Sequence, residues 1–201
     1  FGENNILAIE SSGTEASVSS ITVDDMKAFY DKYFSPSVAR LLITGNLNRE
    51  KVESAFSELI QKWPAKEVIL PELKVPEAPE KSAIYFVNVP GAKQSVIYIG
   101  APSLPRTSPD YHPAVVANYK LGGSFNGILN LILREEKGYT YGARSRFSGG
   151  NCPGSFMAST SVQSNATLET VQIIREEIQR YRQGIPEEDL QFSKDALLKS
   201  N

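Results

Sequence analysis

Residues 139–162, "YTYGARSRFSGGNCPGSFMASTSV", decide the fold. Between Tyr139 and Phe147 two sets of residues alternate. One set is Tyr139, Tyr141, Ala143, Ser145 and Phe147, and the other contains Arg144 and Arg146. Alternation of this period predicts a half-buried β-strand. The glycine-rich residues 149–154 predict a turn, after which residues 155–162 return as a second strand. The stretch therefore predicts an antiparallel hairpin.

A second hairpin is predicted upstream, from residues 83–89 and residues 94–101. Both runs are rich in β-forming residues, and only "PGAK" separates them. Apolar residues at helical spacing predict a helix on each side of Gly122–Gly123 and two more helices after residue 162. Hairpins thus alternate with pairs of helices. This order predicts an α+β fold with a mixed, mainly antiparallel sheet covered by helices on one face.

Residues 1–63 predict a helix, a strand and a second helix. Thr22 and Asp25 have the spacing of a capping box, which marks the start of the first helix. Residues 38–45, "VARLLITG", form a short apolar run typical of a buried strand. The second helix is expected to begin after Asn48 and to end at Trp63. Such a unit is too small to bury its own apolar faces.

Four prolines interleaved with lysines and glutamates mark residues 64–81 as an extended linker. We therefore predict residues 1–63 as the tail of one domain and residues 82–201 as the N-terminal part of the next. Because the chain starts with Phe1 and stops inside an apparent helix, we expect it to be a piece of a longer protein.

Composition excludes several kinds of function. The formal net charge of −2, without a basic stripe, argues against nucleic-acid binding. No apolar run approaches the length needed to span a bilayer. His112 is the only histidine and Cys152 the only cysteine, so the chain offers neither a disulfide framework nor a typical zinc site.

The stretch "LREEKGYTYG", residues 133–142, places an arginine near the end of a predicted helix and two tyrosines at the start of a strand. If Gly138 ends the helix in the left-handed conformation, Arg134 approaches the strand opening. A guanidinium and a phenol there could both donate to one carbonyl oxygen. The alternative is ordinary packing, in which Arg134 caps carbonyls while Tyr139 and Tyr141 fill the core, and this arrangement is the commoner one.

Residues 121–145, "LGGSFNGILNLILREEKGYTYGARS", closely resemble the C-terminal half of the pitrilysin-like inverted zinc peptidases. This family includes insulin-degrading enzyme, the mitochondrial processing peptidase and many bacterial zinc proteases. Residues 21–52, 89–123 and 185–197 resemble further segments of the family in the same order, so the resemblance covers nearly the whole chain. It implies one half of the metallopeptidase LuxS/processing-peptidase-like fold.

The resemblance also implies a role for two residues. In the family, a His-x-x-Glu-His helix and a distal Glu hold the catalytic zinc. This sequence cannot contain that motif, since His112 is its only histidine. The family pattern places a tyrosine seven positions after the arginine of the C-terminal half, which selects Arg134 and Tyr141 rather than Tyr139. An arginine that often follows the "FN" segment in bacterial members is absent here, where Gly127–Ile128 stands.

We therefore expect the parent to be a zinc-dependent endopeptidase. Zinc would lie in an N-terminal domain of the same chain or of a partner chain, and this chain would contact the peptide substrate and be inactive by itself. The alternative is a catalytically inactive homologue that acts as a partner subunit or binding scaffold. Residues 21–63 carry an apolar face that they cannot bury by themselves. This suggests that they dock onto the second domain, either within one chain or, by domain swapping, in a homodimer. The sequence does not indicate a compartment.

Overall fold

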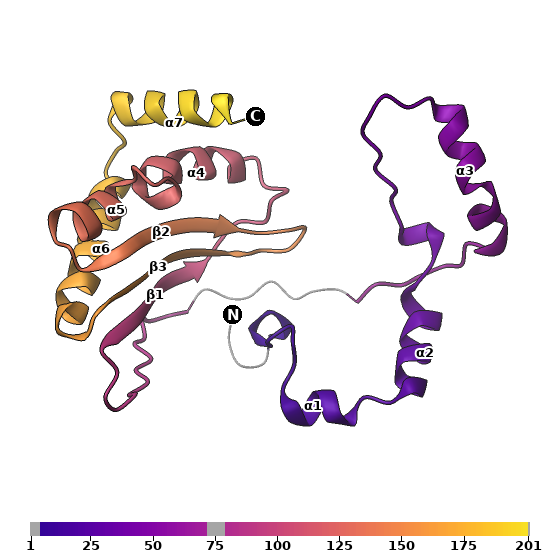
Figure 1. The fold of residues 1–201 in the computed structure, drawn as a ribbon, viewed down its shortest axis with the longest axis horizontal. Helices are drawn as coiled ribbons and strands as arrows, with labels where there is room; N and C mark the ends of the chain where they lie inside the picture. The colour runs from indigo at the N-terminus through magenta and orange to yellow at the C-terminus, as the bar shows by residue number, and fades with distance from the viewer. Residues whose placement is uncertain (1–4, 72–78, 201) are drawn as a thin grey trace. The chain divides into compact units, whose positions relative to one another are not determined.

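The computed structural model describes residues 5–71 and 79–200. The chain divides into two units, one made of residues 3–74 and the other made mainly of residues 75–201 (Figure 1).

The second unit is built on a sheet of antiparallel strands in the order β1-β3-β2. Strand β1 is Gln94–Pro102, β2 is Thr140–Ser148 and β3 is Ser155–Gln163. The β2–β3 hairpin is the one that the alternating sequence predicts. Because β3 lies in the middle, it pairs with β1 along the whole of that strand as well as with β2.

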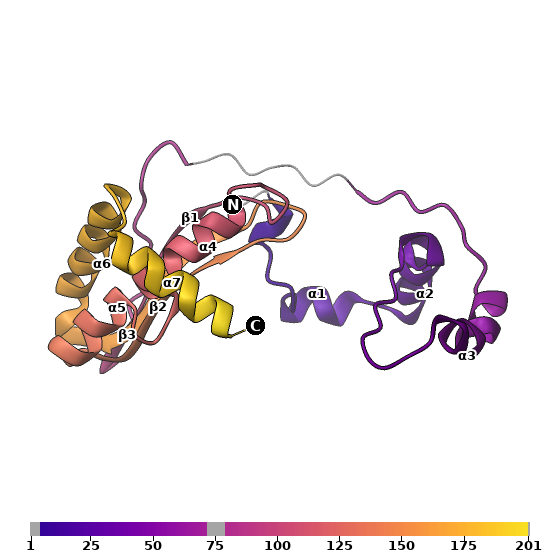
Figure 2. The same cartoon turned by 90° about the horizontal axis from the view of Figure 1, so that it is seen from above.

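Helices from two stretches of the chain pack against this sheet (Figures 1 and 2). Between β1 and β2, helix α4 (Tyr111–Asn118) continues into the π-helical segment η3 (Tyr119–Gly123), and α5 (Ile128–Asn130) continues into a second π-helical segment, η4 (Leu131–Glu136). After β3 come the 3-10 turn η5 (Ser164–Ala166), α6 (Thr167–Arg182) and α7 (Glu187–Lys199). The predicted α+β fold, a sheet with helices on one face, is confirmed.

The core lies between one face of the sheet and the segments η3, α5, η4 and α6, while α7 packs on α4 and η3. The core consists of Leu121, Leu129, Leu133, Ala143, Ala158 and Ile174. From Ala143 onward the side chains of β2 alternate as predicted, since Ala143 and Ser145 are buried while Arg144 and Arg146 are exposed. Tyr141, which the alternation places on the same face as Ala143, is exposed instead. The face of the sheet that carries these arginines is open to solvent in the described part of the chain.

The strand predicted at residues 83–89 is wrong. These residues form no strand, and Ile84 and Phe86 are 92% and 80% exposed. The turn that follows does form: Gly91 adopts a φ of +78°, and the Ala92 N–H donates to the Val89 carbonyl at 3.1 Å. The partner of β1 is nevertheless β3, which is far away in sequence. A strand needs a hydrogen-bonded neighbour, and β-propensity alone does not supply one.

The first unit consists of helices and irregular segments in its described part. They are the 3-10 turn η1 (Ile6–Ala8), α1 (Glu15–Ser20), α2 (Val23–Tyr33), the 3-10 turn η2 (Pro36–Val38) and α3 (Arg49–Lys62). The strand predicted at residues 38–45 is wrong, because no neighbouring strand pairs with it there, and Leu42 is 90% exposed. Across both described ranges, no helix combines the length and apolarity needed to cross a membrane.

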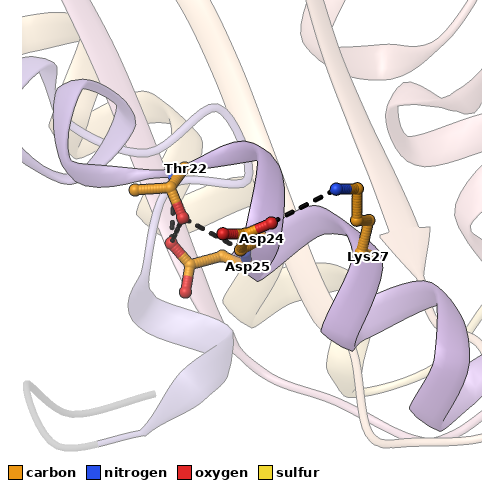
Figure 3. Close-up of polar contacts among 4 residues, drawn as sticks. All are labelled: Thr22, Asp24, Asp25 and Lys27. Carbon is orange, nitrogen blue, oxygen red and sulfur yellow. Dashed lines mark hydrogen bonds and ion pairs between the residues drawn. The ribbon is translucent and has the colours of Figure 1, made fainter.

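Local signals place helix α2 correctly. The Asp25 N–H donates to the Thr22 hydroxyl at 3.2 Å, and the Thr22 N–H donates to the Asp25 carboxylate at 2.8 Å (Figure 3). This reciprocal pair is the predicted capping box. The hydrogen bonds from the Thr22 hydroxyl and the Thr22 N–H lower the pKa of Asp25 below its ordinary value, because they stabilise the ionised carboxylate. On the same turn, Asp24 pairs with Lys27 at 3.3 Å.

Candidate functional site

A groove of about 630 Å³ opens on the uncovered face of the sheet. Its lining comes from β1, β3, the start of β2 and the loop between η3 and α5. Four large side chains that line it are mostly exposed: Val96 and Tyr98 of β1, Phe125 of the loop, and Tyr141 of β2. Exposed apolar groups gathered in one hollow are typical of a binding site.

Tyr141 lies in a β-bulge at the start of β2. Thr140 pairs with Val162 of β3, and Ala143 pairs with Thr160. Two residues of β2, Tyr141 among them, therefore lie opposite a single residue of β3. A bulge bends its strand and changes the direction of a side chain, and bulges are frequent beside active sites. Here the side chain of Tyr141 is 92% exposed and lines the groove.

Threonine hydroxyls hold the bulge in place. The Gly142 N–H donates to the Thr140 hydroxyl at 3.0 Å, and that hydroxyl lies 3.0 Å from the Gly142 carbonyl. The Thr160 hydroxyl from β3 lies 3.0 Å from both the Thr140 hydroxyl and the Gly142 carbonyl. These side-chain contacts replace the ladder hydrogen bonds that the bulge interrupts. The position of Tyr141 is thus fixed by its neighbours rather than by burial of its own ring.

The side chain of Asn130, which is only 2% exposed, joins the groove loop to the bulged strand. Its amide nitrogen donates to the Phe125 carbonyl at 2.8 Å. Its amide oxygen accepts from the Ala143 N–H at 3.0 Å. Both groups are backbone groups, so one buried side chain sets the distance between the loop that carries Phe125 and the strand that carries Tyr141.

Arg134 lies on η4, one helical turn after Asn130. Its guanidinium carbon is 4.6 Å from the centre of the Phe125 ring, a cation–π contact. Its Nη1 is 3.2 Å from the Glu135 carboxylate, close enough for an ion pair. This contact does not have hydrogen-bond geometry, so the buried Nη1 has no hydrogen-bond acceptor among the described residues. Arg134 therefore contacts one groove residue, Phe125, but does not itself line the groove.

The other tyrosine of the pair has a different environment. The Tyr139 hydroxyl donates to the Glu169 carboxylate at 2.7 Å, and the Lys137 ammonium lies 2.9 Å from the same carboxylate. The hydrogen bonds from Tyr139 and Lys137 lower the pKa of Glu169, while the bond to Glu169 raises the pKa of the Tyr139 phenol. The ring of Tyr139 packs against the core. Tyr139 therefore forms structural contacts, and Tyr141 is the tyrosine that remains open.

The turn between helix and strand forms as the sequence predicts. Gly138 has a φ of +64°, and its N–H donates to the Arg134 carbonyl at 3.2 Å. Arg134 contacts Phe125, and Phe125 and Tyr141 both line the groove, but no hydrogen bond links Arg134 to Tyr141 within the described residues. Phe125 and Asn130 were not predicted from the sequence as residues of the site. A sequence signal exists for Asn130, which is a polar residue next to Leu129 on the apolar face of a helix.

The residues that the structure describes do not fit a zinc site. Within the described residues, no group of three or more histidine, cysteine, aspartate or glutamate side chains is placed to hold a metal ion. His112 is exposed at the start of α4, where its ring contacts that of Tyr111 edge-on. Cys152 is half-buried in the β2–β3 turn. Hydrogen-bond donors at the groove include the Tyr141 phenol and the Arg144 guanidinium, and the Arg134 guanidinium contacts the groove residue Phe125.

Comparison with known proteins gives a consistent result. A family model described as the peptidase M16 inactive domain matches residues 20–197. An uncharacterized zinc protease of Streptomyces coelicolor, SCO5738, is 27% identical over 182 residues, which are 89% of this chain and 39% of that protein. The non-peptidase homolog YmxG of Helicobacter pylori is 24% identical over 203 residues, which are 98% of this chain and 45% of that protein.

Solved structures share the fold. The crystal structure of a peptidase M16 inactive domain from Pseudomonas fluorescens matches with a TM-score of 0.88 and 25% sequence identity, covering 96% of this chain and 46% of that one. A protease from Helicobacter pylori matches with a TM-score of 0.78 and 18% identity, covering 94% and 47%. The chain thus spans less than half the length of the curated relatives that it matches.

Proposed function

Because the chain belongs to the family of peptidase M16 inactive domains, we propose that it serves a zinc-dependent endopeptidase by donating hydrogen bonds to the peptide bond that is cleaved. The donors are the Tyr141 hydroxyl and the Arg134 guanidinium. The observation that carries this proposal is the bulge, which presents the Tyr141 phenol in an open groove that Phe125 also lines, while the Arg134 guanidinium makes a cation–π contact with the Phe125 ring.

The chemistry follows from the donor types. When the carbonyl carbon of a peptide is attacked, its oxygen gains negative charge, and donors aimed at that oxygen stabilise the transition state more than the substrate. A phenol supplies one O–H, and a guanidinium supplies several N–H groups and a permanent positive charge. Neither donor needs to change protonation state for this role. Phe125 would keep the guanidinium beside the groove through its cation–π contact.

In this proposal the zinc site lies in another domain of the same protein or in a partner chain. Two relatives are named zinc proteases, which supports zinc chemistry in the family. Residues 1–63 would then be the tail of the preceding domain, residues 64–81 a linker, and residues 82–201 the first part of the domain that faces the substrate. The chain alone is expected to be inactive.

The test is made on the full-length protein that contains this chain. Tyr141→Phe is expected to lower turnover of a quenched fluorogenic peptide by a factor on the order of 10²–10³, as for loss of one oxyanion-hole donor. Its zinc content, measured by atomic emission, is expected to stay unchanged. Tyr139→Phe is the matched control, since it also removes a phenol hydroxyl, but one that contacts Glu169, and it should keep most of the turnover. Wild-type turnover in Tyr141→Phe would exclude a role for this phenol in catalysis.

A second function is favoured by one relative. The Helicobacter pylori protein that matches 98% of the chain is named a non-peptidase homolog. The parent would then be a partner subunit or binding scaffold, and its groove would bind a peptide without cleaving it. The two functions require different sequences outside this chain. Only the peptidase requires a His-x-x-Glu-His motif, in the same protein or in a co-purifying partner. Sequencing the full gene and its co-purifying chain decides between them.

A further inference from the structure

We propose that Arg144 makes the groove selective for peptides that carry an acidic side chain. This inference rests on the proposed function, because it takes the groove as the peptide site, and it adds the class of peptide that is preferred. It concerns a residue with no part in the donation by Tyr141 and Arg134.

The first observation is the charge of the groove. Among the residues that the structure describes, Arg144 is the one charged residue that lines it, and no aspartate or glutamate does. In the part of the chain that the structure describes, the guanidinium of Arg144 forms neither an ion pair nor a side-chain hydrogen bond, and the same is true of Arg146 on the same strand; Arg134, Arg49 and Arg180 have carboxylate partners. A groove with one unpaired positive charge and no negative charge favours an anionic ligand.

The second observation is the shape given by the strand register. Arg144 lies opposite Ser159 of β3, and Ser159 lies opposite Tyr98 of β1. Ser161 of β3 lies opposite Val96 in the same way. Small serines therefore form a low row along β3, flanked by Val96 and Tyr98 on one side. Strands are about 4.8 Å apart, so the flanking strands are separated by about 10 Å, which leaves room for one extended peptide.

The chemistry of the ligand follows from this arrangement. Aromatic and apolar side chains along one wall contact the body of a peptide, as do the serine hydroxyls of the floor. A guanidinium on the opposite wall binds a carboxylate through two parallel N–H donors, a geometry that suits Asp and Glu and no neutral side chain. A Lys or Arg side chain of the peptide at that position would instead be repelled, which adds to the selectivity.

The same strand provides a matched control. Arg146 lies two residues further along β2, on the same exposed face, opposite Met157. It is not among the residues that line the groove. Removing its charge changes the net charge of the protein by the same amount as removing that of Arg144. The two substitutions therefore separate binding in the groove from a general electrostatic attraction.

The experiment measures peptide binding to the full-length protein by fluorescence anisotropy at low salt. The probes are labelled neutral peptides in which one Glu is moved through each position in turn, each paired with its Gln counterpart. At one position we expect the Glu peptide to bind about threefold to tenfold more tightly than the Gln peptide, the range for a partly exposed ion pair. Arg144→Gln should abolish this preference, Arg144→Glu should reverse it toward a Lys peptide, and Arg146→Gln should keep it.

Three results would overturn the inference: no binding of any peptide, no difference between Glu and Gln at any position, or a difference that survives Arg144→Gln. The outcome is independent of the turnover test, since Tyr141→Phe leaves the charge of the groove unchanged and should keep the Glu preference. A Glu preference that depends on Arg144, in a protein whose turnover is unaffected by Tyr141→Phe, would support this inference and refute the catalytic proposal.

Discussion

The two units of the chain differ in what holds their secondary structure. In residues 79–200, helices and strands share a core in which Leu129 and Leu133 are fully buried. In residues 5–71, helices α2 and α3 have no buried residue, and the apolar side chains of α2 lie exposed. Both units were predicted to contain helices and strands, but only helices formed in the one without a core.

The difference shows which elements depend on distant partners. A helix satisfies its backbone within itself, and its ends are fixed by neighbours in sequence such as Thr22 and Asp25. A strand forms no backbone hydrogen bonds within itself and depends on a neighbouring strand for them. Residues 38–45 are largely apolar and have high β-propensity, but without such a neighbour they form no ladder. Residues 94–102 do form a strand, because β3 pairs with all of them.

The largest effect is expected on the free energy of unfolding when a core side chain is removed. One substitution in each unit makes the comparison. Leu133→Ala removes a fully buried side chain and is expected to lower the free energy of unfolding by about 2–5 kcal/mol. Leu59→Ala on α3, where the side chain is 50% exposed, should change it by less than about 0.5 kcal/mol. Urea unfolding followed by circular dichroism measures both. Equal losses would mean that residues 5–71 also bury Leu59 in solution.

A second substitution tests how closely the helices approach the sheet. A Cβ added at Gly122 would lie 2.5 Å from the Ser145 hydroxyl and 2.7 Å from the Ser145 backbone nitrogen, so Gly122→Ala is expected to cost about 1–3 kcal/mol. Gly150→Ala is the control, because an added Cβ there meets nothing within 4 Å. Thermal unfolding compares the two. A Gly122→Ala protein as stable as wild type would show that η3 can move away from β2.

A third prediction concerns the buried amide that links loop and strand. Asn130→Ala leaves the Phe125 carbonyl and the Ala143 N–H without their partner and is expected to cost about 1–3 kcal/mol. Amide hydrogen exchange at Ala143 should become faster, while exchange at the far end of β2, near Phe147, should change less. Asn126→Ala, at an exposed position of the same loop, serves as the control. Unchanged exchange at Ala143 would contradict the linking role of Asn130.

The smallest expected effect lies in the unit without a core. Because the capping hydrogen bonds lower the pKa of Asp25, the helix stabilisation that they supply is present above the ordinary aspartate pKa and is lost as the pH falls through the lowered value. Thr22→Ala removes the hydroxyl, the larger cause, so the pKa of Asp25 should rise toward its ordinary value. Titration of the Asp25 carboxyl by NMR measures the shift, with Asp24 as the internal reference. An unchanged pKa in Thr22→Ala would exclude the capping box as its cause.

The sequence by itself determined the elements whose cause is local. The alternation from Ala143 to Phe147, the capping box and the left-handed Gly138 all gave the correct local structure, because each depends on residues within a few positions of one another. The alternation was wrong at Tyr141, which the bulge exposes. The sequence pattern also selected Arg134 and Tyr141 as candidates, and their role remains a prediction.

Tertiary structure alone decided the remaining features. Which strand lies beside β1 depends on a ladder formed with residues about 60 positions away. The bulge exposes Tyr141, while the Tyr139 hydroxyl bonds to Glu169. This difference depends on the register between β2 and β3, because a shift of one residue would turn each side chain to the opposite face of the sheet. The groove, with Arg144 unpaired beside a row of serines, exists only once three strands are in register, so no single stretch of the sequence could have shown it.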